Sequence, residues 1–186
     1  MNKNAYTLIE ILVAVAIFSF VIAGPTGLFV SSLTGQRKAL NSMEIADSVS
    51  YALEYVSRTL RMAKKDLDGS CIISGSNYEN PGHDISRIRF LNYQDPPLCQ
   101  EFSVNNGQLG ERKSSDEKGE NLGLFQPLTP DDLEIILLKF QLFGETQEDN
   151  FQPRVTILVE IQKKDHPESK IRLQTTISQR NLDVRY

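Results

Sequence analysis

Apolar positions divide the chain into one long apolar run and a set of patterned segments. Residues 11–36 carry no charged side chain, and residues 11–30 are almost entirely apolar. A helix rises 1.5 Å per residue, so this stretch is about 30 Å long, the thickness of the hydrocarbon core of a bilayer. The run therefore predicts a membrane-spanning helix.

A second pattern begins after Gly35, where apolar residues recur at steps of four and three. These residues are Ile45, Val49, Leu53, Val56, Leu60 and Ala63. This spacing places them on one stripe of an α-helix, with charged residues on the other faces. We predict a single helix from Thr7 to about Asp66, closed by Gly69, with a length of roughly 90 Å if it is continuous. The "GPTG" segment at 24–27 predicts a kink or local melting at Pro25.

The remainder of the chain shows strand-like patterns separated by turn-forming segments. Residues 70–84 are rich in Gly, Pro, Asn and Ser and predict a loop, and the charged residues 110–121 predict a solvated loop. Strands are expected at 85–93, at 98–104 before an Asn-Asn-Gly hairpin turn, at 108–109, and most clearly at 133–143, 154–162 and 170–179. Turn-like connections favour antiparallel neighbours. The predicted fold class is α+β, a long helix packed on an antiparallel sheet of about three to five strands.

Composition and charge narrow the functional classes. The chain has 186 residues, 40% of them apolar and 24% charged, which leaves room for one globular domain plus an appendage. The net charge of −4 gives no basic excess, so no nucleic-acid partner is predicted. No phosphate-binding loop, nucleophile elbow or zinc-ligand spacing is present. We therefore expect neither an enzyme nor a cofactor.

The remaining polar residues that could bind a ligand have simpler interpretations. His83 and His166 lie in predicted loops and are expected to be solvated rather than metal ligands. The oxygen-rich loops lack the ligand spacing of a calcium loop, so no metal is predicted. Four basic residues near the end of the long helix, Arg58, Arg61, Lys64 and Lys65, could touch lipid, a neighbouring subunit or DNA. A solvated face near a helix C-terminus, where cations are favoured, explains them better.

Two features of the sequence leave alternatives open. Cys71 and Cys99 would form a disulfide outside the cytoplasm, or would remain two buried thiols. The apolar run could be a signal peptide cut after Ala23, although its single basic residue Lys3 and its internal carboxylate Glu10 argue against removal. Basic residues lie on both sides of the run, so charge alone does not orient it.

Glu10 is the carboxylate that opens the apolar run, and an unpaired charge in an apolar environment is costly. One explanation is local, because Thr7-x-x-Glu10 is a capping-box pattern at a helix N-terminus. The wider sequence offers another. The polar leader "MNKNA" is followed by an aromatic residue, by Thr-Leu-Ile-Glu and then by an unbroken apolar helix. In this respect the chain resembles the type IV pilin and pseudopilin family.

The resemblance implies a processing site and a domain plan. A prepilin peptidase would cut between Ala5 and Tyr6 and methylate the new amine of Tyr6. Ala5 stands where the family usually has Gly. The expected organisation is a leader at 1–5, a transmembrane and assembly helix at 6–36, and a pilin-like α+β domain at 37–186 that includes the amphipathic helix to about residue 66.

The resemblance also implies how the chain assembles. Residues Thr7, Leu8, Ile9 and Glu10 would form the assembly segment, with Glu10 neutralised by the methylated amine of a neighbouring copy's Tyr6. The expected partners are prepilin peptidase, other pilins or pseudopilins, the inner-membrane assembly platform and membrane lipid. The expected location is the cytoplasmic membrane with the C-terminal domain outside the cytoplasm, and then a pilus or pseudopilus. That location makes a disulfide between the two cysteines plausible.

Two further segments suggest a subclass. "YALEYVSRTLRMA" at 51–63 and "TTISQRNL" at 175–182 are similar to J-type minor pseudopilins of type II secretion and to related minor pilins. A major pilin is disfavoured by the divergent charged loop, and the tip-capping class by the acidic Glu10. The implied function is a structural subunit of a type II secretion pseudopilus or a type IV pilus, including those used in competence. The alternative is an extracytoplasmic binding module tethered by an uncleaved helix.

Overall fold

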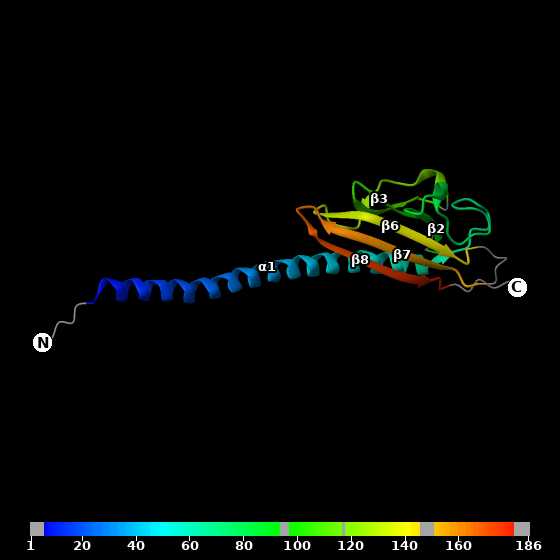
Figure 1. Ribbon diagram of the computed structural model, residues 1–186. Coiled ribbons are helices and arrows are strands. Elements are labelled where there is room, and N and C mark those ends of the chain that lie inside the picture. The colour runs from blue at the N-terminus through cyan, green and yellow to red at the C-terminus, as the bar shows by residue number, and fades with distance from the viewer. Residues whose placement is uncertain (1–5, 94–96, 117, 146–150, 181–186) are drawn as a thin grey trace. The chain divides into compact units, whose positions relative to one another are not determined.

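The computed structural model describes residues 6–93, 97–116, 118–145 and 151–180. The chain divides into two compact units, Met1–Asn41 and Ser42–Tyr186, and each is described by itself. The elements, of which α1, β2, β3, β6, β7 and β8 are labelled in Figure 1, are α1 (Leu8–Arg61), β1 (Ala63–Lys64), η1 (Pro81–His83), β2 (Ile88–Asn92), β3 (Leu98–Asn105), β4 (Gln108–Lys113), η2 (Gly119–Asn121), β5 (Gln126–Pro127), β6 (Leu133–Phe143), β7 (Arg154–Lys163) and β8 (His166–Ser178).

The first unit contains the apolar part of α1, and this part stays helical through Pro25. The expected local melting at this proline is therefore wrong. Proline removes one backbone donor, and the rest of the hydrogen-bond ladder continues on both sides. The Thr26 hydroxyl donates to the Ile22 carbonyl at 2.8 Å, which adds a side-chain bond in the same turn.

The helix ends at Arg61, five residues before the predicted Asp66. The reason is a competing strand pairing. Ala63 lies opposite Asn92 and Lys64 lies opposite Leu91, so the backbone becomes extended and joins β2 as β1. The residues that suggested a helix cap, Asp66–Gly69, instead form a turn.

The described residues of the second unit form two antiparallel sheets, which confirms the α+β class and the antiparallel prediction. A five-stranded sheet has the order β1-β2-β3-β4-β5, and a three-stranded sheet has the order β6-β7-β8. Figure 1 shows the green strands of the first sheet beside the yellow to red strands of the second. The expectation of one sheet was too simple, because the chain starts a second sheet after β5.

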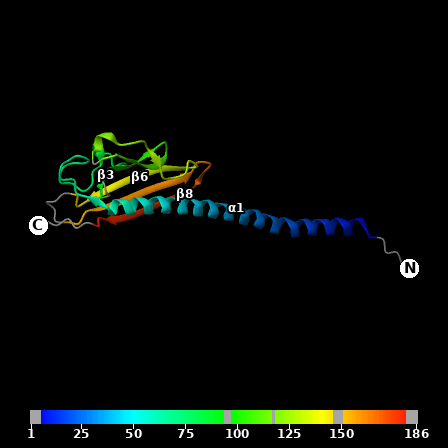
Figure 2. The same cartoon turned by 180° about the vertical axis from the view of Figure 1, so that it is seen from behind.

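One hydrophobic core joins the helix to both sheets, and Figure 2 shows the second-unit part of α1 passing along the β6–β8 sheet. All six residues of the predicted stripe are buried, from Ile45 at 0% exposed to Leu53 at 8%. Five of them lie on α1, which confirms the helical stripe there, whereas Ala63 lies in β1. Their partners include Phe90, Phe102, Phe140, Ile157 and Ile161. The apolar residues of the helical pattern and those of the strands thus pack in the same hydrophobic core.

The charged segment at 110–121 is partly a strand rather than a solvated loop. β4 runs from Gln108 to Lys113, and Glu111 within it is 4% exposed. Its carboxylate accepts hydrogen bonds from Tyr55 on α1 at 2.9 Å and from Gln100 on β3 at 2.5 Å, and pairs with Lys113 at 2.9 Å. A charge can be buried here because three donors replace its water.

The two cysteines form a disulfide in a smaller hydrophobic cluster. Cys71 and Cys99 have a Cα–Cα distance of 5.5 Å and are 5% and 0% exposed. Ile72, Leu91 and the partly buried Leu122 pack around them. The bridge ties the loop that follows β1 to the start of β3.

Asp66 organises the same loop from its other end. Its buried carboxylate accepts hydrogen bonds from the backbone N–H groups of all five residues 68–72, at 2.7 to 3.4 Å. Burial alone would raise the pKa of Asp66, but these donors outweigh it and the pKa lies below its usual value. The loop is therefore fixed by a charge at one point and by a disulfide at another.

Candidate functional site

The candidate assembly segment lies at the start of α1 in the first unit, where Thr7 caps the helix. The Thr7 backbone N–H and its hydroxyl both donate to Glu10 Oε2, at 3.0 and 3.1 Å. In return the Glu10 backbone N–H donates to Thr7 Oγ1 at 3.4 Å. This reciprocal arrangement is a capping box. In the single chain, Glu10 is therefore held by Thr7, as the capping explanation predicted.

The cap uses only half of the Glu10 carboxylate. Both Thr7 donors reach Oε2, and among the described residues no hydrogen-bond donor of the protein reaches Oε1. A carboxylate has room for about four hydrogen bonds. The second oxygen can therefore accept a cationic donor from another molecule while the cap stays intact.

Apolar side chains surround this carboxylate and are not covered by the protein. Tyr6, Leu8 and Ile9 are 83%, 81% and 70% exposed. The apolar part of α1 is long and apolar enough to cross a membrane, and none of that stretch is buried in the structure. Such a surface is stable only against lipid or against other apolar helices.

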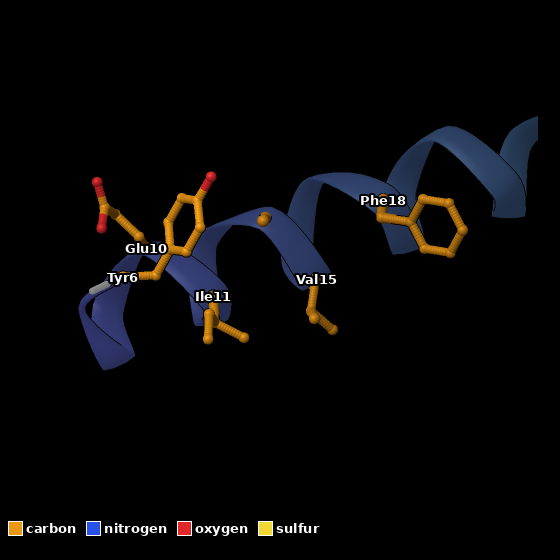
Figure 3. A pocket seen from close by; sticks show the side chains of 6 residues that line it. Tyr6, Glu10, Ile11, Val15 and Phe18 are labelled. Carbon is orange, nitrogen blue, oxygen red and sulfur yellow. The ribbon is translucent and has the colours of Figure 1, made fainter. Parts of the chain in front are cut away.

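A shallow depression of about 550 Å³ runs along the same part of the helix, lined by Tyr6, Glu10, Ile11, Ala14, Val15 and Phe18. Figure 3 shows the Tyr6 ring and the Glu10 carboxylate extending to the same side of the helix, with Ile11 and Val15 on the other side. Tyr6 and Glu10 thus present a combined aromatic and anionic edge at the helix start. The other lining positions, Ile11, Ala14, Val15 and Phe18, offer apolar contacts.

The other residues singled out in the sequence lie elsewhere. Ala5 lies outside the described residues, so the structure describes only the Tyr6 side of the expected cleavage bond. Cys71 and Cys99 are in the second unit and have no part in the assembly segment. His83 is exposed, while His166 begins β8 rather than lying in a loop, with its Nδ1 at 3.2 Å from Glu168 Oε1.

Groups that the sequence suggested for ion binding do not come together. Within the described part of the chain, no cluster of three or more His, Cys, Asp or Glu side chains could hold a metal ion. The basic residues near the end of α1 are partly engaged: Arg58 pairs with Glu54 at 2.5 Å, and the Lys64 ammonium lies 5.4 Å from the centre of the Tyr93 ring. Arg58 thus lies on a solvated helix face, and Lys64, which belongs to β1 rather than to the helix, rests on an aromatic ring.

Sequence reasoning missed the polar network between α1 and β4. The Lys113 ammonium donates to Tyr55 Oη at 2.8 Å as well as binding Glu111. Burial lowers the pKa of Lys113, but its hydrogen bonds to Glu111 and Tyr55 raise it by more, so the pKa of Lys113 is raised overall. The pKa of Tyr55 is also raised, mainly because the hydroxyl is partly buried. No apolar pattern in the sequence pointed to this network, because β4 reads QLGERK and Leu109 is its single large apolar side chain.

Comparison with known proteins supports the interpretation of the N-terminus. Residues 1–24 match the family described as the prokaryotic N-terminal methylation motif. This match supports a type IV pilin-like protein with prepilin-type processing, a membrane anchor and a structural role. No curated protein and no solved structure matches the chain.

Proposed function

We propose that this pilin-like chain is a minor pilin or pseudopilin that is cut between Ala5 and Tyr6, methylated on the Tyr6 amine and assembled through its apolar helix. The machine is a type II secretion pseudopilus or a type IV pilus, and the subclass closest in pattern is the J-type minor pseudopilin. Its partners are prepilin peptidase, other pilins or pseudopilins, the inner-membrane platform and membrane lipid. The domain that starts near residue 37 lies outside the cytoplasm.

One observation carries this proposal: a capped carboxylate with an unused oxygen stands at the start of an uncovered apolar helix. In a bundle of apolar helices an unpaired carboxylate costs several kcal/mol. The methylated amine of a neighbouring Tyr6 remains cationic and can bind Oε1 of Glu10. In surroundings of low dielectric constant this pairing favours a single axial offset between neighbours, and so sets the register of assembly.

A second candidate is favoured by the capping box itself. Because Thr7 already gives Glu10 a local partner, an uncleaved helix that only tethers a binding module would also tolerate this carboxylate. That candidate needs neither a free Tyr6 amine nor a neighbouring subunit. Intact-mass measurement and N-terminal sequencing of the protein from native membranes separate the two. A chain that starts at N-methyl-Tyr6 supports the subunit, and a chain that starts at Met1 supports the tether.

Two substitutions at position 10 separate charge pairing from capping. Glutamine can occupy the same position of a capping box, so Glu10→Gln keeps an acceptor for Thr7 and removes the charge, whereas Glu10→Ala removes both. We expect both variants to insert and fold but to be depleted from the sheared filament fraction by about tenfold or more, the equivalent of about 1.4 kcal/mol per subunit contact. If Glu10→Gln assembles like the unaltered chain while Glu10→Ala does not, Glu10 acts only as a cap and the pairing proposal is wrong.

A further inference from the structure

A short segment between β4 and β5 separates the Cys71–Cys99 disulfide from solvent. We name this segment, residues 114–116 and 118–123, the bridge cover. Most of its described residues are exposed, whereas the two cysteines are 5% and 0% exposed. The bridge cover is therefore a thin layer of chain over a buried disulfide.

Hydrogen bonds tie the bridge cover to both segments that the disulfide joins. On the β3 side, Cys99 N–H donates to the Asp116 carbonyl at 3.1 Å. On the side of the loop after β1, Gly119 N–H donates to the carbonyl of Ser70, the residue before Cys71, at 2.9 Å. The bridge cover thus spans the disulfide from one partner to the other.

Gly119 lets the bridge cover lie directly against the disulfide. A Cβ added at this position would lie 2.8 Å from the Cys71 carbonyl oxygen and 3.4 Å from Cys99 Sγ, so there is no room for a side chain. Leu122 anchors the same segment, because it packs against the small cluster that contains both cysteines and Ile72. Backbone contact at one point and an apolar contact at another keep the segment closed.

The bridge cover is held less firmly than the other neighbours of the disulfide. Cys99 belongs to β3 and lies opposite Leu91 of β2, within a ladder of paired residues. The loop before Cys71 is fixed by the buried carboxylate of Asp66. The bridge cover, by contrast, begins after β4 ends and finishes before β5 begins, so it has no ladder of its own. Segments with few buried apolar contacts open locally at a smaller free energy than central strands.

We propose that the bridge cover controls reduction of the Cys71–Cys99 disulfide in the folded chain. A dithiol reaches the sulfurs only after the bridge cover detaches, while β2, β3 and the turn at Asp66 stay in place. Anything that lifts residues 114–116 and 118–123 therefore makes the disulfide reducible without unfolding the domain. This control does not depend on assembly through Glu10.

The reaction itself is ordinary thiol–disulfide exchange. One thiolate of the dithiol attacks one sulfur of the bridge, the S–S bond breaks, and the other cysteine leaves as a thiolate. The second thiolate of the dithiol then displaces the first cysteine from the mixed disulfide. The dithiol ends as a cyclic disulfide, and its electron pair and two protons pass to Cys71 and Cys99.

Reduction kinetics of the full-length chain in detergent micelles test this control. Dithiothreitol is added, samples are quenched by alkylation, and the mass gives the reduced fraction. In Gly119→Ala the added Cβ forces the bridge cover away from the Cys71 carbonyl, so we expect reduction about tenfold faster than in the unaltered chain. The control Lys118→Ala shortens an exposed side chain of the same segment and should keep the rate within about twofold. Equal rates for Gly119→Ala and the unaltered chain overturn the proposal.

The urea dependence of the rate separates local opening from unfolding. Well below the unfolding midpoint, we expect the reduction rate to rise only slightly with urea, because lifting the bridge cover exposes little surface. The same weak dependence is expected for Gly119→Ala, which distinguishes a lifted cover from a less stable domain. A rate that rises from the lowest urea concentration with the full dependence of unfolding overturns the proposal, since reduction would then require the unfolded chain.

Amide exchange measures the same opening without a reductant. Leu122→Ala removes the apolar anchor and adds no atom, so it keeps the test decisive if Gly119→Ala does not fold. We expect exchange of the Gly119 amide and reduction of the disulfide to accelerate by the same factor in Leu122→Ala, because both require the bridge cover to detach. The amides of β3, which lies between β2 and β4, should not change. Faster exchange at Gly119 with an unchanged reduction rate overturns the proposal.

Discussion

Loss of the Cys71–Cys99 disulfide should lower the stability of the second unit by about 3 to 4 kcal/mol. The bridge closes a loop with a sequence separation of 28, and the chain-entropy relation gives this amount at 25 °C. The native state should change little, because Asp66 holds the same loop through its backbone bonds. The effect is therefore expected to act mainly on the unfolded chain.

Urea unfolding of the full-length chain in detergent micelles measures this free energy. The sequence has six tyrosines and no tryptophan, and Tyr78 is 2% exposed, so tyrosine fluorescence follows opening of the core. The variant Cys71→Ala/Cys99→Ala is compared with the unaltered chain before and after thiol reduction. Reduction keeps both sulfur atoms, so it separates the cross-link from packing of the side chains.

If the cross-link acts mainly on the unfolded chain, two results are expected. The reduced chain and the double alanine variant should lose similar amounts of stability, and the urea dependence should rise as the denatured state expands. A loss below about 1 kcal/mol in both would refute the reasoning, because the cross-link would then not restrict the unfolded chain as its loop length implies.

Three further predictions concern the second unit. Gly110→Ala should cost about 1 to 3 kcal/mol in urea unfolding, because an added Cβ would lie 2.3 Å from Phe125 Cζ, and an unchanged midpoint would contradict this packing. The pKa of Asp66 is lowered in the folded state, so the stability that its carboxylate contributes is fully present above the unfolded pKa of 3.8 and is lost as pH falls through the folded pKa. Asp66→Asn should therefore cost most stability near neutral pH and less at about pH 3, and a loss that does not depend on pH would refute this linkage. Tyr55→Phe should cost about 1 kcal/mol by removing the hydroxyl that binds Glu111, and a neutral result would show that water replaces that bond.

The sequence alone determined the long helix, its division into an apolar part and an amphipathic part, and the strands whose apolar residues form a regular pattern. The six residues of the apolar stripe are all buried, five of them on α1 and Ala63 in β1, and β6 begins and ends where the apolar pattern does. Thr7 and Glu10 form the capping box that their spacing predicts. These features depend on residues close in the chain, so period and capping chemistry are sufficient to find them.

Tertiary contacts decided what the local pattern could not. The helix stops at Arg61 because Ala63 pairs with Asn92 of β2, far along the chain. β4 can be a strand with a buried charge because Tyr55 and Gln100 donate hydrogen bonds to the Glu111 carboxylate. The place of β8 at the edge of its sheet likewise exists only through strand order, which a single strand's sequence does not encode. In each case the deciding interaction joins residues distant in sequence, and its free energy exceeds the local preference that it overrides.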